Sequence, residues 1–165
     1  MEKVGGMKEP ELIDKFVTIK QVVSEEAAPI FRKTGDVAEL LVDYGLHERV
    51  QEELWVITLD GSRSVRTIYR VAQGGYHDCD ISLAAVLSPV FLSATDRFVV
   101  AHNHPSGELV ATGPDIELSD QISQAADLLG LMFEDHIIMT PQREWYSMKG
   151  NHQLRLPTTR VSGRR

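Results

Sequence analysis

Hydrophobic positions along this chain follow two kinds of spacing, one typical of strands and one typical of a helix. Between residues 114 and 129 apolar side chains recur every three or four positions, which predicts an amphipathic helix that ends at Gly130. The positions expected on its buried stripe are Leu118, Ile122, Ala125, Ala126 and Leu129. Shorter apolar runs predict strands. These runs cover residues 16–23, 54–59, 65–71, 98–101, 131–139 and 145–148.

Two further helices are expected from cap residues. Thr34-Gly35-Asp36 opens a helical stretch over 37–44, and Gly45 follows where a left-handed residue closes a helix. Another helix lies within 83–95, where Pro89 is expected near the first turn or as a disturbance, because proline lacks a backbone N–H.

The order of these elements predicts the fold class. Asp60-Gly61-Ser62 separates the runs 54–59 and 65–71, which favours a β-hairpin. The later strands alternate with helices, as in α/β proteins. We therefore expect an α/β domain with a mixed β-sheet flanked by helices, because the early hairpin argues against a purely parallel sheet.

Two histidines at the end of the run 98–101 carry the candidate chemistry. Residues i and i+2 of an extended chain point to the same side, so His102 and His104 present both imidazoles together. The loop 105–113 then leads back to Asp115 at the start of a helix. Two nitrogens and one oxygen leave a fourth tetrahedral position for water, which is the composition of a catalytic rather than a structural zinc site.

Simpler interpretations exist for the same residues. Thr112-Gly113-Pro114-Asp115 also has the pattern of a capping box, with Thr112 as N-cap and Asp115 at N3. The two interpretations are compatible, because a capped helix start is a rigid support for a ligand. His136 is expected in strand packing or hydrogen bonding. His47, His77 and His152 are expected on the surface, and Trp55 and Trp145 in the core.

Composition limits the partners and the compartment. The formal net charge is −7, which disfavours nucleic acid as a partner, although the last residues are basic. No apolar run is long enough to span a bilayer, and no signal peptide is visible. Cys79 is the single cysteine, which fits a reducing cytoplasm. We expect a flexible end over 1–12, a domain over 13–148 and a basic tail over 149–165.

The spacing of these residues resembles a known motif. A pattern of His-x-His, seven residues, Ser or Thr, two residues and Asp is similar to the JAMM motif of the JAB/MPN metallopeptidases. The segments His102-Asn103-His104-Pro105-Ser106-Gly107 and Asp135-His136-Ile137-Ile138 resemble the RadC branch more narrowly. The resemblance extends from about Val37 to about Met148 and implies the layered, cytidine-deaminase-like fold of JAB/MPN domains.

The resemblance also implies a role for each matching residue. The positions that match the zinc ligands are His102, His104 and Asp115, with one Zn²⁺ per chain. Thr112 lies where the family usually has a serine that helps stabilise the tetrahedral intermediate. Glu52 matches the catalytic glutamate, and its neighbour Glu53 is the alternative. Adjacent strand residues face opposite sides, so only one of the two glutamates can reach the metal.

The function implied is zinc-dependent hydrolysis of an amide or isopeptide bond in a peptide or protein substrate. One alternative is a DNA-repair-associated accessory protein, the traditional label of RadC-like proteins. The helix-hairpin-helix segment often found ahead of their JAB domain is not expected here. Another alternative is a non-catalytic interaction module, although this chain keeps the full ligand set. No sequence feature sets the oligomeric state or the identity of the substrate.

Overall fold

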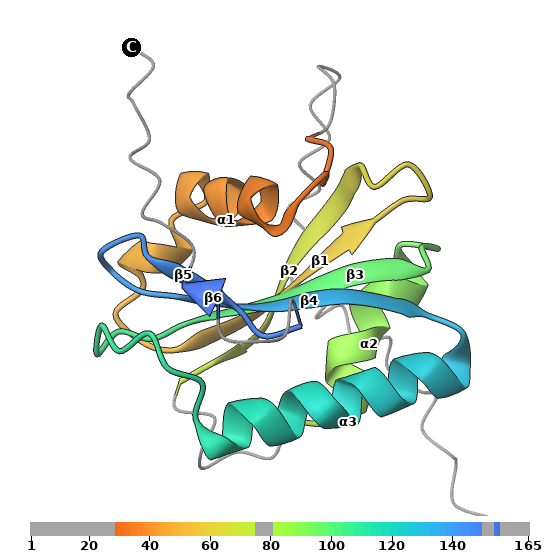
Figure 1. Cartoon of the computed structure of the whole chain (residues 1–165). Coiled ribbons are helices and arrows are strands. Elements are labelled where there is room, and N and C mark those ends of the chain that lie inside the picture. The colour runs from red at the N-terminus through yellow and green to blue at the C-terminus, as the bar shows by residue number, and fades with distance from the viewer. Residues whose placement is uncertain (1–28, 75–80, 150–153, 156–165) are drawn as a thin grey trace, which may run out of the picture.

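The computed structural model describes residues 29–74, 81–149 and 154–155. Within these ranges a mixed sheet lies between two helical layers, with α1 on one face and α2 and α3 on the other (Figure 1). The elements in chain order are α1 (Thr34–Asp43), η1 (Leu46–Glu48), β1 (Glu53–Leu59), β2 (Val65–Gln73), α2 (Leu83–Leu92), β3 (Arg97–Asn103), α3 (Gly113–Leu129), β4 (Met132–Met139), β5 (Trp145–Ser147) and β6 (Leu154–Arg155).

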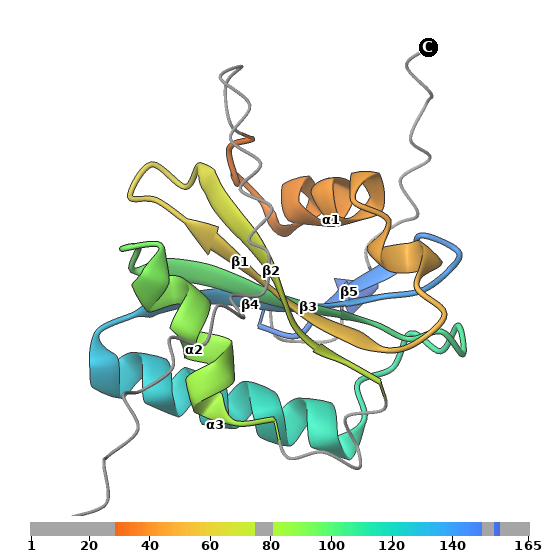
Figure 2. The same ribbon diagram turned by 180° about the vertical axis from the view of Figure 1, so that it is seen from behind.

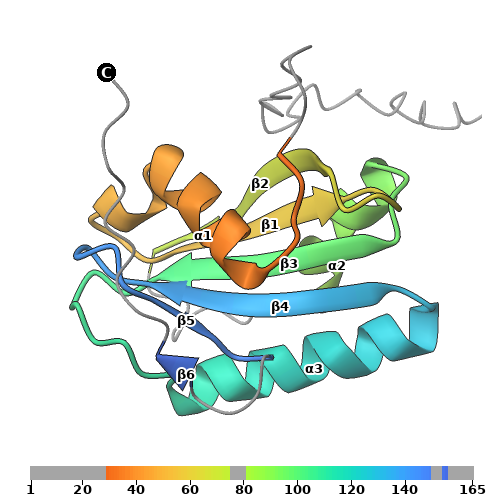
Figure 3. The same cartoon turned by 45° about the horizontal axis from the view of Figure 1, so that its top comes forward.

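The sheet has six strands in the order β2-β1-β3-β4-β5-β6 (Figure 3). Strands β3 and β4 pair in parallel, and α3 connects them; the other neighbours pair antiparallel. A parallel pair needs a crossover connection, whereas the β1–β2 pair is closed by the predicted turn at Asp60. The predicted α/β fold with a mixed, helix-flanked sheet is therefore confirmed.

Alternation along β1 and β3 divides the core into two clusters. Trp55 is paired with Ala101 on the side of α1, whereas Val56 is paired with Val100 on the side of α2 and α3. From behind, α2 and α3 are seen to cover this second face together, and they pack against each other (Figure 2). His102, two residues after Val100, therefore faces the α2–α3 side, and Asn103 faces the α1 side.

Several expectations on individual elements are confirmed and two are wrong. Trp55 and Trp145 are buried, and Gly130 ends α3 with a φ of 69°. Leu129, expected on the buried stripe of α3, is the last residue of the helix and is 50% exposed. Pro89, expected near the first turn or as a disturbance, lies inside α2 and is buried, and the helix continues past it to Leu92.

Some expectations fall on residues that the structure does not describe. The strand over 16–23, the end over 1–12, and His77, Cys79 and His152 lie outside the described residues. Of the expected tail 149–165, only residue 149 and the strand β6, which pairs with β5, are described. Among the described helices, none combines the length and the apolar character that a membrane crossing requires.

Candidate metal centre

Three neighbouring segments bring the predicted ligands together: the end of β3, the turn that follows it, and the first turn of α3. The backbone N–H of His104 donates to the carbonyl oxygen of Met139 at 2.8 Å, which anchors the turn to the end of β4. Gly107 closes the turn with a φ of 82°, and a Cβ there would lie 3.2 Å from Oε1 of Gln142. The left-handed φ favours glycine at this position, and a Cβ would in addition require the Gln142 side chain to move.

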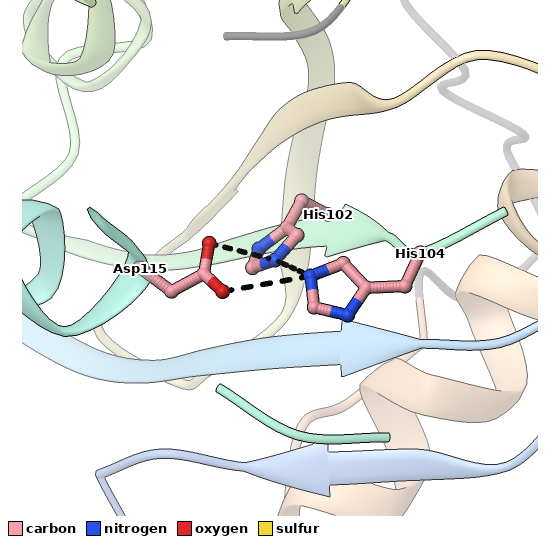
Figure 4. Close-up of side chains that lie close together, drawn as sticks. All are labelled: His102, His104 and Asp115. Carbon is pink, nitrogen blue, oxygen red and sulfur yellow. Dashed lines mark hydrogen bonds and ion pairs between the residues drawn. The ribbon is translucent and has the colours of Figure 1, made fainter. Parts of the chain in front are cut away.

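The ligand atoms form a small triangle (Figure 4). Nε2 of His102 lies 2.9 Å from Nε2 of His104 and 3.2 Å from Oδ1 of Asp115. Nε2 of His104 lies 3.5 Å from Oδ2 of Asp115. All three side chains are buried, which removes them from competing water. The structure thus brings together the three residues that the sequence pattern selected as ligands.

The position of Asp115 follows from the start of α3. Thr112 is the N-cap, and Asp115 is at N3 of a capping box. The Thr112 N–H and hydroxyl donate to Asp115 Oδ2 at 2.7 and 2.6 Å. Oδ1 is the carboxylate oxygen nearer to His102. The same contacts that begin the helix therefore hold the third ligand in one orientation.

Hydrogen bonds on the outer side of each imidazole define which nitrogen faces the centre. Nδ1 of His104 lies 2.8 Å from the carbonyl oxygen of Glu108. A carbonyl oxygen only accepts, so Nδ1 carries the proton and neutral His104 turns the lone pair of Nε2 inward. Nδ1 of His102 lies 2.9 Å from Nε2 of the buried His136. That contact leaves Nε2 of His102 facing the centre as well.

The ionisation of the cluster is coupled. Burial acts to raise the pKa of Asp115, but its contacts with His102 and His104 outweigh that effect and hold the pKa well below its usual range. Burial lowers the pKa of His102 despite the nearby carboxylate. Burial also opposes charge on His104, but Asp115 and the Glu108 carbonyl raise its pKa overall. An anionic carboxylate beside two inward-facing nitrogens makes a site suited to a cation.

The donor set fits a zinc ion. Zinc bonds to histidine nitrogen and carboxylate oxygen are about 2.0–2.2 Å long, so tetrahedral donors lie about 3.3 Å apart. The separations between the two Nε2 atoms, and from each Nε2 to its nearer recorded Asp115 oxygen, run from 2.9 to 3.5 Å and bracket that value. Two imidazoles and one carboxylate from three buried residues would hold the ion and leave further positions open. His102, His104 and Asp115 are the metal-capable group found among the described residues.

The two candidate glutamates face opposite sides of the sheet. Glu53 is buried on the α1 side, where its carboxylate accepts from Trp55 Nε1 at 2.8 Å and pairs with Arg70 at 3.4 Å. Glu52 precedes β1 and is half-buried, and its charge acts to raise the pKa values of both His102 and His104. Glu52 is thus the glutamate whose charge acts on the histidines, and Glu53 is engaged elsewhere.

His47 was wrongly predicted to lie on the surface, and His136 contacts a candidate ligand directly. His47 is buried in η1 rather than exposed, because Arg143 from the β4–β5 turn covers it and donates to its Nε2 at 3.3 Å. His136 does hydrogen-bond, as predicted, but its partner is the candidate ligand His102. In the parallel register His136 is opposite Val100, and this pairing, invisible in the sequence, places it beside His102.

The structure thus has the arrangement that the resemblance to JAB/MPN domains implied: a mixed sheet with His-x-His at the end of one strand and an aspartate in the first turn of the next helix. The family model described as "RadC-like JAB domain" matches residues 31–154. The chain belongs to this family, as the sequence resemblance predicted.

Curated relatives extend the same similarity. A UPF0758 protein of Chloroflexus aggregans is 35% identical over 115 residues, covering 70% of this chain and 49% of that protein. UPF0758 proteins of Clostridium perfringens and Porphyromonas gingivalis are 27% and 29% identical over 121 and 97 residues. These matches cover 73% and 59% of this chain, and 53% and 43% of those proteins. The chain thus spans about half the length of the curated relatives it matches.

Proposed function

We propose that this domain is a zinc-dependent hydrolase of the JAMM class that cleaves an amide or isopeptide bond in a peptide or protein. The observation that carries the proposal is the buried cluster of two imidazole nitrogens 2.9 Å apart and one carboxylate, whose Oδ1 lies 3.2 Å from His102 Nε2 and whose Oδ2 lies 3.5 Å from His104 Nε2. A structural zinc site uses four protein ligands, whereas three protein ligands leave room for water and substrate.

His102, His104 and Asp115 would hold the ion, and their outer hydrogen bonds keep each donor atom aimed inward. A zinc ion bound there supplies Lewis acidity, which lowers the pKa of bound water and polarises the substrate carbonyl. Histidine must be neutral and aspartate ionised to bind a metal. The low pKa values of Asp115 and His102 favour that state, whereas the raised pKa of His104 makes binding weaken as the pH falls.

Glu52 is the proposed general base. It takes a proton from the attacking water as the oxygen bonds to the carbonyl carbon. It returns that proton to the amide nitrogen as the C–N bond breaks, so the products are a carboxylic acid and an amine. Support for this assignment comes from its electrostatic effect on both candidate ligands and from the engagement of Glu53 on the other face.

Thr112 has two proposed contributions. Its hydroxyl orients Asp115 through the contact at 2.6 Å. The resemblance assigns the same hydroxyl a second task, to stabilise the oxygen that gains negative charge as water adds to the carbonyl. A hydroxyl has a single proton, so it serves one acceptor at a time.

The test combines metal analysis with a peptide-library digestion followed by mass spectrometry. We expect one zinc per wild-type chain, loss of that zinc in H102A, and cleavage that falls about 10²–10⁴-fold in E52Q with zinc retained. Zinc retained in H102A would refute the ligand assignment. Equal cleavage by the wild type and E52Q would remove Glu52 as the base. A zinc-loaded wild type that cleaves no library member or isopeptide-linked conjugate would favour the non-catalytic alternative.

A further inference from the structure

Asn103 lies between the two candidate histidine ligands, and sequence reasoning assigned it no role. Strand alternation turns its side chain away from the ligands, toward the α1 side of the sheet. There it is almost fully buried, at 1% exposure. A buried primary amide must satisfy its donors and its acceptor, so its partners are informative.

All hydrogen bonds recorded for the Asn103 side chain go to the backbone of one short segment. Oδ1 accepts from the N–H of Glu53 at 2.8 Å. Nδ2 donates to the carbonyl oxygens of Arg49 and Gln51, both at 3.0 Å. Since the backbone partners are unambiguous donors and acceptors, they also define which end of the amide is oxygen and which is nitrogen.

These contacts hold the peptide groups on both sides of Glu52. The carbonyl of Gln51 belongs to the peptide group before Glu52, and the N–H of Glu53 belongs to the one after it. The second group is held at its other end as well, because the Glu52 carbonyl accepts from the N–H of Gly74 at 2.8 Å. With both flanking peptides anchored, the Cα–Cβ direction of Glu52 is set.

We infer that Asn103 is a positioning residue that sets the Glu52 carboxylate relative to His102 and His104. This inference rests on the proposed function for its catalytic consequence. The physical reason is that residues 102–104 act on both sides of the sheet. The imidazoles of His102 and His104 face the centre on one side, and Asn103 hydrogen-bonds to the peptide groups that flank Glu52 on the other. The separation between the base and the ligands then depends on the Asn103 side chain together with the β1–β3 pairing, which sets Leu54 opposite His102.

The test is a double-mutant cycle between Asn103 and Glu52. We expect N103A to keep zinc stoichiometry and KM but to lower kcat about 100-fold, the cost of a misplaced catalytic group. E52Q should keep a measurable residual kcat, because loss of a general base costs about 10²–10⁴-fold. In the E52Q background N103A should lower that residual kcat no further, because the group it positions is gone. N103D is the second variant if N103A does not fold. Its carboxylate still accepts from Glu53 but cannot donate to the two carbonyls.

Thr58→Val is the matched control. Thr58 is also fully buried on β1 and shares a hydrogen bond of 2.6 Å with Thr67, away from the segment that carries Glu52. T58V should lower the melting temperature but leave kcat and the behaviour of the metal unchanged. If T58V and N103A both lost kcat in proportion to their loss of stability, the role of Asn103 would be merely structural. That result would overturn the inference.

A second readout needs no substrate. In the Co²⁺-loaded protein we will follow the pH at which the visible absorption spectrum changes. E52Q should shift that pH, N103A should shift it in the same direction, and the double variant should match E52Q. An N103A spectrum that titrates like the wild type would overturn the role of Asn103, even if library cleavage is present. Absence of cleavage with the expected shifts would instead refute the hydrolase function and leave the positioning role standing.

Discussion

Nδ1 of His102 lies 2.9 Å from Nε2 of His136, and both imidazoles are completely buried. When His102 binds a cation through Nε2, its Nδ1 carries the proton and donates it to His136. The partner of a metal-bound histidine is usually a carboxylate, a backbone carbonyl or water. Here it is a neutral imidazole. The pKa of His136 lies well below its ordinary value, mainly because of burial and further because of His102, so the acceptor nitrogen stays available.

Loss of this acceptor should weaken metal binding. H136F, which fills the space without an acceptor, is expected to bind zinc about 10–100-fold more weakly than the wild type, the usual cost of losing such an outer partner. H136Q offers a carbonyl oxygen in a similar place and should recover part of the affinity. Competition titration with a chromophoric chelator measures both. An H136F affinity equal to that of the wild type would show that the contact does not support the ligand.

The stability of the metal-free protein should fall as the pH drops below about 6.5, the pKa of histidine in an unfolded chain. At such pH values His136 binds a proton in the unfolded chain but stays neutral in the folded chain, where burial lowers its pKa. The free energy of unfolding therefore decreases as the pH falls. Depressed pKa values of His47 and His102 act in the same direction, and the raised pKa of His104 acts against it.

Comparison with H136F isolates the contribution of His136. Urea unfolding with chelator present, at several pH values between 7.5 and 5, should show a smaller loss of stability in H136F than in the wild type. The difference between the two unfolding free energies should therefore change with pH, by at most about 1.4 kcal/mol per pH unit for one proton. A difference that is constant over this range would contradict the low pKa.

Thr112 offers a way to separate capping from chemistry. T112S keeps the hydroxyl and should retain stability, zinc and activity. T112V keeps the shape but loses the hydroxyl that contacts Asp115, so it should be destabilised by about 0.5–2 kcal/mol and bind zinc less tightly. Thermal unfolding and zinc titration give these values. If T112V lost kcat while zinc affinity and stability were unaffected, the hydroxyl would act on the substrate rather than on Asp115.

Gly107 should be intolerant of a side chain. G107A places a Cβ at a φ of 82° and 3.2 Å from Gln142 Oε1, so we expect a loss of about 1–2 kcal/mol in stability. Zinc affinity should fall too, because the same turn supplies the Glu108 carbonyl that orients His104. Gly61 is the control: nothing lies within 4 Å of a Cβ there, and G61A should be close to neutral. Equal effects of the two substitutions would contradict the strained turn.

The sequence by itself determined the local features of this protein. His102 and His104 share a side because alternation operates over two residues, and Thr112 caps the helix of Asp115 because a capping box spans four. Most strands and helices were predicted for the same reason: periodicity and turn residues act within a few positions. The family resemblance also rests on such short, contiguous patterns.

Only the tertiary structure decided which distant residues meet these ligands. The pairing of β1 with β3 set Leu54 opposite His102, which decided that Glu52 rather than Glu53 acts on the histidines. The parallel pairing of β3 with β4 brought His136 to His102. The hydrogen bonds from Asn103 to the peptide groups that flank Glu52 depend on the β1–β3 register. Strand register is set by the packing of both sheet faces against their helices, a property of the whole core that no local pattern contains.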